Sequence, residues 1–185
     1  MARTKTTRSA WIDAGLVALA EHGVDEVRVE VLARDLGVTK GGFYGAFEGR
    51  ADLLDAMVER WESAVTDDVV REVESAQDLD PRDRLRRLVA VIGRQDDPAT
   101  RIDTEIGLRD WARRAPHVAT VVDRVDAMRG TYLRDIFRGF CAEDEADVRT
   151  AIAMSVRLAG QTMTLGAGSR DPDEVARLIY RRLLA

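Results

Sequence analysis

The chain has 185 residues, of which 33% are charged and four are prolines, a composition typical of a soluble helical protein with one domain or a small domain fused to a larger one. Its single cysteine, Cys141, excludes an intrachain disulfide and is interpreted as a bystander, and His22 and His117 lack zinc-ligand spacing. No apolar run approaches the roughly 18 residues of a membrane span, and no apolar signal segment begins the sequence. We therefore expect a cytoplasmic protein.

The charge is unevenly distributed along the chain. Although the net charge is −5, residues 1–50 carry seven basic and seven acidic side chains, so the rest of the chain carries the whole deficit. Arg3, Lys5 and Arg8 form a basic arm that precedes the first acidic residue, Asp13. This balance argues against a protein that coats nucleic acid without sequence preference, but it allows a local DNA-binding segment.

The first predicted helix covers residues 8–21, where apolar side chains recur with helical period. The two threonines just before it can cap its start, and Gly23 ends it. The next run, Val27–Val31, alternates like a β-strand, but a lone strand in a helical chain could not pair its backbone groups. We therefore predict a helix over residues 29–36.

A tight turn and a second short helix come next. Gly37 supplies the backbone freedom for the turn, and Thr39 is placed to cap a helix that runs to about Phe47. At about 100° per residue, Phe43 and Phe47 fall on one side of this helix. The opposite side carries Lys40, Gly41, Tyr44 and Gly45. Two short helices joined by a tight turn, the second with one side that packs and one side that is free, predict a helix-turn-helix that binds DNA.

The remainder of the chain is predicted to be helical as well. A long helix over residues 50–75 carries an apolar stripe and connects the N-terminal segment to the later helices. Three of the four prolines follow an aspartate that can cap a helix start. The helices predicted from this punctuation cover residues 81–94, 98–113, 116–140, 144–166 and 171–184. The sequence therefore predicts an all-α fold.

The last two predicted helices carry more apolar surface than one small bundle needs. Small residues at Ala151, Ala153 and Gly160 would allow a close approach of another backbone. The apolar positions are Ile152, Val156, Ala159, Met163, Val175, Leu178 and Ile179. These surfaces could simply close the core of one subunit, but together they favour a homodimer interface.

Short motifs cluster in the first fifty or so residues. They are Ala14 and Gly23 around the first helix, Leu32-Ala33, Gly37-Val38-Thr39 at the turn, Tyr44, Phe47, and Arg50 with Leu53-Leu54. In this combination they resemble the DNA-binding domain of the TetR family of transcriptional regulators, from which Gly42 and Ala46 depart by lacking a polar side chain. The resemblance implies an N-terminal three-helix helix-turn-helix DNA-binding domain over residues 1–49. It also implies a C-terminal helical ligand-binding and dimerisation bundle over residues 50–185.

Candidate DNA contacts lie on and around the second short helix. Lys40 begins this helix on its free side, where phosphates are attracted, although chance could also have placed a lysine there. Tyr44 could pack on a sugar and bond a phosphate, or be a half-buried core aromatic. Gly41 and Gly45 could let the backbone approach the groove, or merely turn the chain. The other candidates, for which solvation or capping alone is the alternative, are Arg3, Lys5, Arg28, Thr39 and Arg50.

A candidate effector pocket is marked by large apolar side chains from several helices and by polar residues inside apolar patterns. Its members would be Met57, Trp61, Leu88, Ile92, Glu105, Trp111, Met128, Tyr132, Arg157 and Gln161. The apolar members are equally expected in a plain core. Glu105 could instead pair with Arg109, four residues further along its helix.

The sequence offers no Ser-His-Asp arrangement, metal-ligand spacing or phosphate-binding glycine loop, so we predict neither an enzyme nor a cofactor. We expect a homodimeric, ligand-responsive repressor that is released from double-stranded operator DNA by a small, largely apolar effector. The alternative is a helical dimer that binds a ligand or a partner protein and has a weakened DNA reader. The missing contacts at Gly42 and Ala46 support that alternative.

Overall fold

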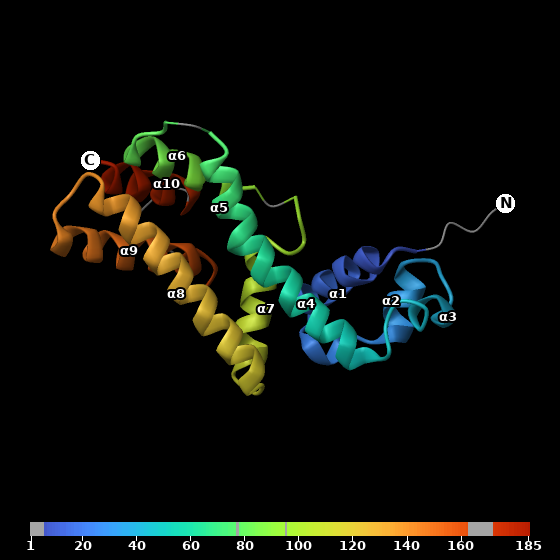
Figure 1. Ribbon diagram of the computed structural model, residues 1–185. Coiled ribbons are helices and arrows are strands. Elements are labelled where there is room, and N and C mark those ends of the chain that lie inside the picture. Colours follow the sequence, from blue (N-terminus) through green and yellow to red (C-terminus); the bar gives the residue numbers. More distant parts are fainter. Residues whose placement is uncertain (1–5, 77, 95, 163–171) are drawn as a thin grey trace. The chain divides into compact units, whose positions relative to one another are not determined.

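The computed structural model describes residues 6–76, 78–94, 96–162 and 172–185. These residues form helices joined by turns and contain no strand, which confirms the predicted all-α class (Figure 1). Within the described ranges, no helix combines the length and the apolar character that a membrane crossing requires.

The chain forms two compact units. Unit 1 consists of Met1–Asp68 and Arg94–Val125, and unit 2 consists of Val69–Gly93 and Asp126–Ala185. The boundary predicted between residues 49 and 50 falls inside unit 1, because the helix that starts at Arg50 packs against the first helix of the chain. As a division between DNA-binding and ligand-binding functions, that boundary stays a prediction.

Unit 1 is built around its first helix. Its elements are α1 (Arg8–His22), the 3₁₀ helix η1 (Val24–Glu26), α2 (Val29–Asp35), α3 (Lys40–Phe43), α4 (Arg50–Val65), α7 (Ile102–Ala112) and the start of α8 (Pro116–Arg138). The Thr7 hydroxyl accepts a hydrogen bond from the Ala10 N–H at 3.2 Å and so caps α1. Gly23, with φ +83°, ends α1, as the sequence predicts.

The core of unit 1 joins α1 to both α4 and α7. Trp11 and Leu16 of α1 and Met57 and Trp61 of α4 are all fully buried. A Cβ on Gly15 would lie 2.6 Å from Met57 Sδ, so a larger residue at this position would require the Met57 side chain to move. The backbones of α7 and α1 are close together at Gly107, because a Cβ built on this glycine would lie only 3.0 Å from the Leu19 carbonyl oxygen.

Unit 2 contains most of α5 (Asp67–Glu74), α6 (Pro81–Ile92), the rest of α8, α9 (Glu143–Thr162) and α10 (Pro172–Leu183), with α10 packed against α9. Its buried core residues are Val73, Leu85, Leu88, Ile136, Phe137, Ala146, Ala153 and Leu183. Asp80 caps α6 by accepting hydrogen bonds from the N–H groups of Arg82 and Asp83, and Pro81 is the first helical residue. This start confirms the aspartate–proline prediction for α6.

Two of the predicted limits of the longer helices are wrong. The helix expected over residues 50–75 is broken at Thr66, where the backbone leaves the helical conformation with φ −123° and ψ −86°. The helix expected from residue 98 begins only at Ile102, because Asp97 accepts from the Ala99 N–H and organises a turn there instead.

Candidate DNA-binding site

The helix-turn-helix is formed by α2, a turn at Gly37 and α3. Gly37 has a φ of +65°, a conformation that glycine adopts without strain, and the Val38 N–H donates to the Ala33 carbonyl oxygen at 2.9 Å. The predicted turn is therefore confirmed, as is the helical interpretation of the segment after Val27.

The second helix of this motif is shorter than the sequence predicts. α3 ends at Phe43 instead of continuing to Phe47, and residues 44–46 form a turn. Three glycines in this segment weaken a helix by about 1 kcal/mol each relative to alanine, which accounts for the shortening. Thr39 occupies the N-cap position with an extended backbone, but its side chain makes no capping hydrogen bond.

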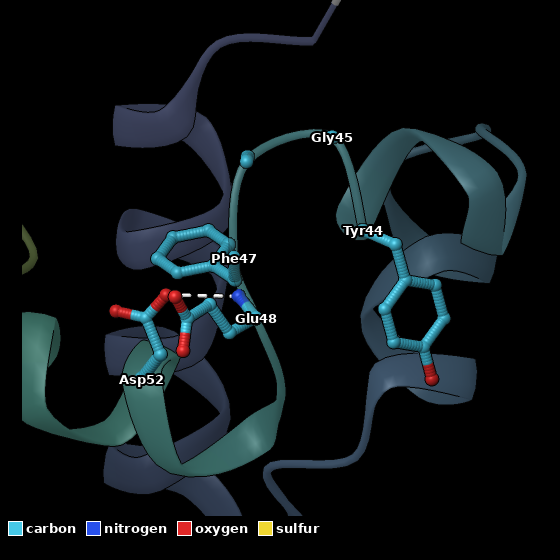
Figure 2. A pocket seen from close by; sticks show the side chains of 6 residues that line it. Tyr44, Gly45, Phe47, Glu48 and Asp52 are labelled. Carbon is cyan, nitrogen blue, oxygen red and sulfur yellow. Dashed lines mark hydrogen bonds between the residues drawn. The ribbon is translucent and has the colours of Figure 1, made fainter.

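The two faces of α3 differ as predicted. Phe43 and Phe47 are buried, stack on each other with their centroids 5.2 Å apart, and belong to the core of unit 1. Tyr44 is 64% exposed, and Figure 2 shows its ring directed away from Phe47. Tyr44 is thus not a core aromatic, and Gly41 and Gly45 are exposed beside it.

Lys40 is exposed and bound to an acidic residue of the preceding helix. Its Nζ donates to Glu30 Oε1 at 2.7 Å, across the turn between α3 and α2. This hydrogen bond from Lys40 is the main cause that holds the pKa of the Glu30 carboxyl below its ordinary value. The first turn of α3 therefore presents an ion pair and not an isolated cation.

The arginines of the described N-terminal segment are also engaged within the protein. The ion pairs are Arg8 with Asp52, Arg28 with Glu26, and Arg34 with Asp35. Arg8 also lies over the Phe47 ring, with its guanidinium carbon 4.7 Å from the centroid. Arg3 and Lys5, the other predicted contacts in this segment, lie outside the described residues.

Arg50 has a structural role that was not predicted from the sequence. Its Nε donates to the Val27 carbonyl oxygen at 2.6 Å and its Nη2 to the Val24 carbonyl oxygen at 2.5 Å. These bonds tie the start of α4 to η1 and to the linker that follows it. A signal was present in the sequence, because a cation in the first turn of a helix is disfavoured by the helix dipole and needs a specific partner.

A shallow, open depression of about 250 Å³ lies beside Tyr44 (Figure 2). Its lining residues are Tyr44, Gly45, Ala46, Phe47, Glu48 and Asp52. Asp52 Oδ2 accepts a hydrogen bond from the Glu48 N–H at 3.0 Å and so helps to organise the start of α4. With two carboxylates in its lining, the depression itself does not attract a phosphate.

The predicted effector residues are divided between the two units. Met57, Trp61 and Trp111 belong to the core of unit 1. Leu88 belongs to the core of unit 2, and Ile92 and Tyr132 pack against that core. Met128 is 41% exposed. An effector site built from these residues stays a prediction.

The polar candidates have intramolecular partners. Glu105 is 1% exposed, and its Oε1 accepts from Arg109 Nη2 at 2.8 Å, which is the i, i+4 pair that the sequence allowed as an alternative. Burial raises the pKa of Tyr180, and the positive charge of Arg157 on α9 partly offsets this increase. The Gln161 side chain lies outside the described residues.

The predicted dimer residues lie on α9 and α10. Ile152 of α9 is 41% exposed, and Val148, one helical turn before it, is 52% exposed. The predicted residues that are partly buried are Val156, Ala159, Val175, Leu178 and Ile179, of which Ile179 packs against the core of unit 2. Met163 lies outside the described residues.

Comparisons with known proteins match the part of the chain that contains the helix-turn-helix. Residues 12–57 match the family described as bacterial regulatory proteins, tetR family. The chain is 37% identical over 57 residues to TtgW, an uncharacterized HTH-type transcriptional regulator of Pseudomonas putida. That alignment covers 31% of this chain and only 42% of the relative.

Solved structures resemble the chain over most of its length. The fatty acid degradation regulator FadR from Bacillus halodurans matches with a TM-score of 0.68 and 18% identity, over 98% of this chain and 97% of that one. A transcriptional regulator from Rhodococcus sp. Rha1 matches with a TM-score of 0.67 and 17% identity, over 97% and 92% of the two chains. At such low identity these likenesses show a shared fold. The matched proteins are described as regulators, and the segment of this chain that matches the tetR family of bacterial regulatory proteins, residues 12–57, contains the helix-turn-helix.

Proposed function

We propose that this transcriptional regulator is a homodimeric repressor that binds operator DNA through α3 and leaves it when a small, largely apolar effector binds. One observation carries the DNA-binding part of this proposal. Lys40 at the start of α3 and Tyr44 directly after its end are both exposed, while Phe43 and Phe47 fix the other side of the segment in the core. A lysine ammonium and a tyrosine hydroxyl on this exposed side suit phosphate and sugar contacts.

Homodimerisation is supported by the exposed apolar side chains on α9. Val148 and Ile152 are exposed and lie one turn apart on the same helix, so together they form an apolar stripe on the surface of α9. A two-fold dimer would present two copies of α3 to a near-palindromic site with half-sites about 34–36 Å apart. An effector that favours another dimer geometry would then release the DNA.

The test is binding of the full chain to DNA upstream of its own operon, compared with shuffled DNA of equal length, by fluorescence anisotropy over a range of salt concentrations. We expect a preference for the upstream DNA that falls in affinity with rising salt. Tyr44→Ala and Lys40→Ala should each weaken binding, whereas Arg86→Ala, which removes one positive charge from the Arg86–Asp83 pair of unit 2, should not. A wild-type protein with no preference at any salt would refute the proposal.

A second candidate is a helical dimer that binds a ligand or partner protein and has a weakened DNA reader. It is favoured by the single turn of α3 and by the intramolecular partners of the described basic side chains in residues 6–50. This candidate predicts a stable dimer in solution with no footprint on the upstream DNA. The binding experiment above therefore separates the two.

A further inference from the structure

The reader helix carries a lysine that is already bound to an anion of the same chain. Lys40 is the first residue of α3 and Glu30 is the second residue of α2. Their charged atoms, Lys40 Nζ and Glu30 Oε1, are 2.7 Å apart, and the two side chains are 55% and 62% exposed. The pair therefore lies at the surface that the proposed function places against DNA.

We infer that the Glu30 carboxylate is a built-in competitor of DNA, which holds Lys40 Nζ in the free protein and lowers the affinity of this ammonium for a backbone phosphate. This inference rests on the proposed DNA-binding function and adds to it a residue that limits affinity. A carboxylate and a phosphate offer the same chemistry to an ammonium, namely anionic oxygens that accept charge-assisted hydrogen bonds. Lys40 Nζ has three N–H donors, and Glu30 accepts from one of them and so directs the ammonium towards α2. A phosphate that approaches Nζ from that side meets the carboxylate in its place.

The ion pair is poorly placed for the alternative role of stabilising the fold. Both side chains are largely exposed, and exposed pairs are weakened by solvent and salt. Opening the pair leaves neither group buried without a partner, so the pair can be exchanged for a phosphate without disturbing the core. Its consequence is then seen in DNA affinity and not in protein stability.

The experiment compares Glu30→Gln with Glu21→Gln, a matched control that removes one exposed negative charge at the end of α1. Affinities for the upstream DNA are measured at several salt concentrations, alone and in the Lys40→Ala background. We expect Glu30→Gln to tighten binding about two- to fivefold at low salt, as for an exposed charge pair. We expect Glu21→Gln to change it less, and most of the Glu30→Gln gain to disappear when Lys40 is absent.

A measurement without DNA keeps this inference separate from the proposed function. The pKa of the Glu30 carboxyl, followed by NMR in the free protein, should rise towards its ordinary value in the Lys40→Ala variant. A Glu30→Gln gain that equals the Glu21→Gln gain, or that persists without Lys40, would overturn the competition while leaving DNA binding in place. If the pair is seen by NMR but no variant prefers the upstream DNA, the proposed function fails and the competition fails with it.

Discussion

Arg50 at the start of α4 donates from Nε to the carbonyl oxygen of Val27, at a distance of 2.6 Å, and from Nη2 to that of Val24. One carbonyl group of η1 and one of the linker that follows it therefore both accept from one planar guanidinium. The orientation of α2, and with it the turn that leads to α3, depends on a side chain from the next helix along the chain.

Removing this guanidinium should destabilise unit 1. Arg50→Ala is expected to lower the free energy of unfolding by about 1–3 kcal/mol, because two backbone carbonyls lose a charged donor. Arg50→Lys should recover only part of the loss, since an ammonium lacks the planar fork that reaches both oxygens. Urea unfolding followed by circular dichroism measures the effect, with Arg28→Ala as the control. Equal stabilities for Arg50→Ala and Arg28→Ala would contradict the structural role.

The exposed glycines of the reader segment should tolerate alanine. Gly41 and Gly45 have no positive φ, and a Cβ would come no closer than 3.8 Å and 3.6 Å, respectively, to other atoms. Gly41→Ala and Gly45→Ala are expected to raise the free energy of unfolding by about 0.5–1 kcal/mol each. Gly37→Ala, at a φ of +65°, should lower it. Thermal unfolding of the three variants tests this ordering, and a loss of stability at both positions 41 and 45 would show that the fold requires glycine there.

Position 42 offers a way to satisfy a buried donor. The indole Nε1 of Trp11 is buried and has no hydrogen-bond partner among the described residues. A Cβ on Gly42 would lie 4.0 Å from Trp11 Cζ2, which belongs to the same edge of the indole as Nε1. Gly42→Ser places a hydroxyl near that edge and should be more stable than Gly42→Ala, despite the lower helix propensity of serine, by up to about 1 kcal/mol. Chemical unfolding of the two variants decides the point, and a less stable serine variant would show that the hydroxyl does not reach the indole.

Unit 2 should lose stability on acidification through Glu74. The hydrogen bond from the Tyr132 hydroxyl to Glu74 Oε1, at 2.6 Å, is the main cause that lowers the pKa of Glu74, and Arg84 adds to it. A lowered pKa in the folded state contributes stability above the unfolded pKa of about 4.3, and this contribution is lost as the pH falls through the folded value.

Tyr132→Phe removes the main cause of this dependence. The variant should be less stable than the wild type at pH 7, and the difference should shrink as the pH falls below about 4. Tyr180→Phe, at another partly buried tyrosine of unit 2, is the control for loss of a hydroxyl. Unfolding midpoints between pH 3 and 7 provide the measurement. A Tyr132→Phe difference that is constant over this range would mean that Glu74 is not the group involved.

Local signals in the sequence were sufficient for most of the backbone. Gly23 and Gly37 adopt the positive φ that their positions predict, and Thr7 and Asp80 cap the helices that begin after them. These features depend on a few neighbouring residues, which a sequence displays directly. The break at Thr66 was missed because the apolar pattern continues across it and neither a glycine nor a proline stands there to end a helix.

Partners of the candidate site could not be predicted in the same way. Lys40 meets Glu30 ten residues away, and Arg50 meets carbonyl groups 23 and 26 residues away. Both contacts exist only after the helices have packed, and neither follows a helical or strand spacing. The sequence therefore identified the basic side chains around the reader helix. It did not show that, from residue 6 onward, these side chains are already bound to acidic side chains or carbonyl groups of the same chain.

The contact between Gly107 of α7 and the Leu19 carbonyl of α1 has a mechanical consequence. Where two helices touch through side chains, rotamer changes can absorb a small displacement before it reaches the other backbone. At Gly107 there is no side chain, and the Leu19 main chain lies directly against the glycine. A shift of α7 towards α1 would therefore meet the α1 backbone directly and displace α1. Because α1 carries Trp11, which packs against Phe43, the displacement would reach the reader segment.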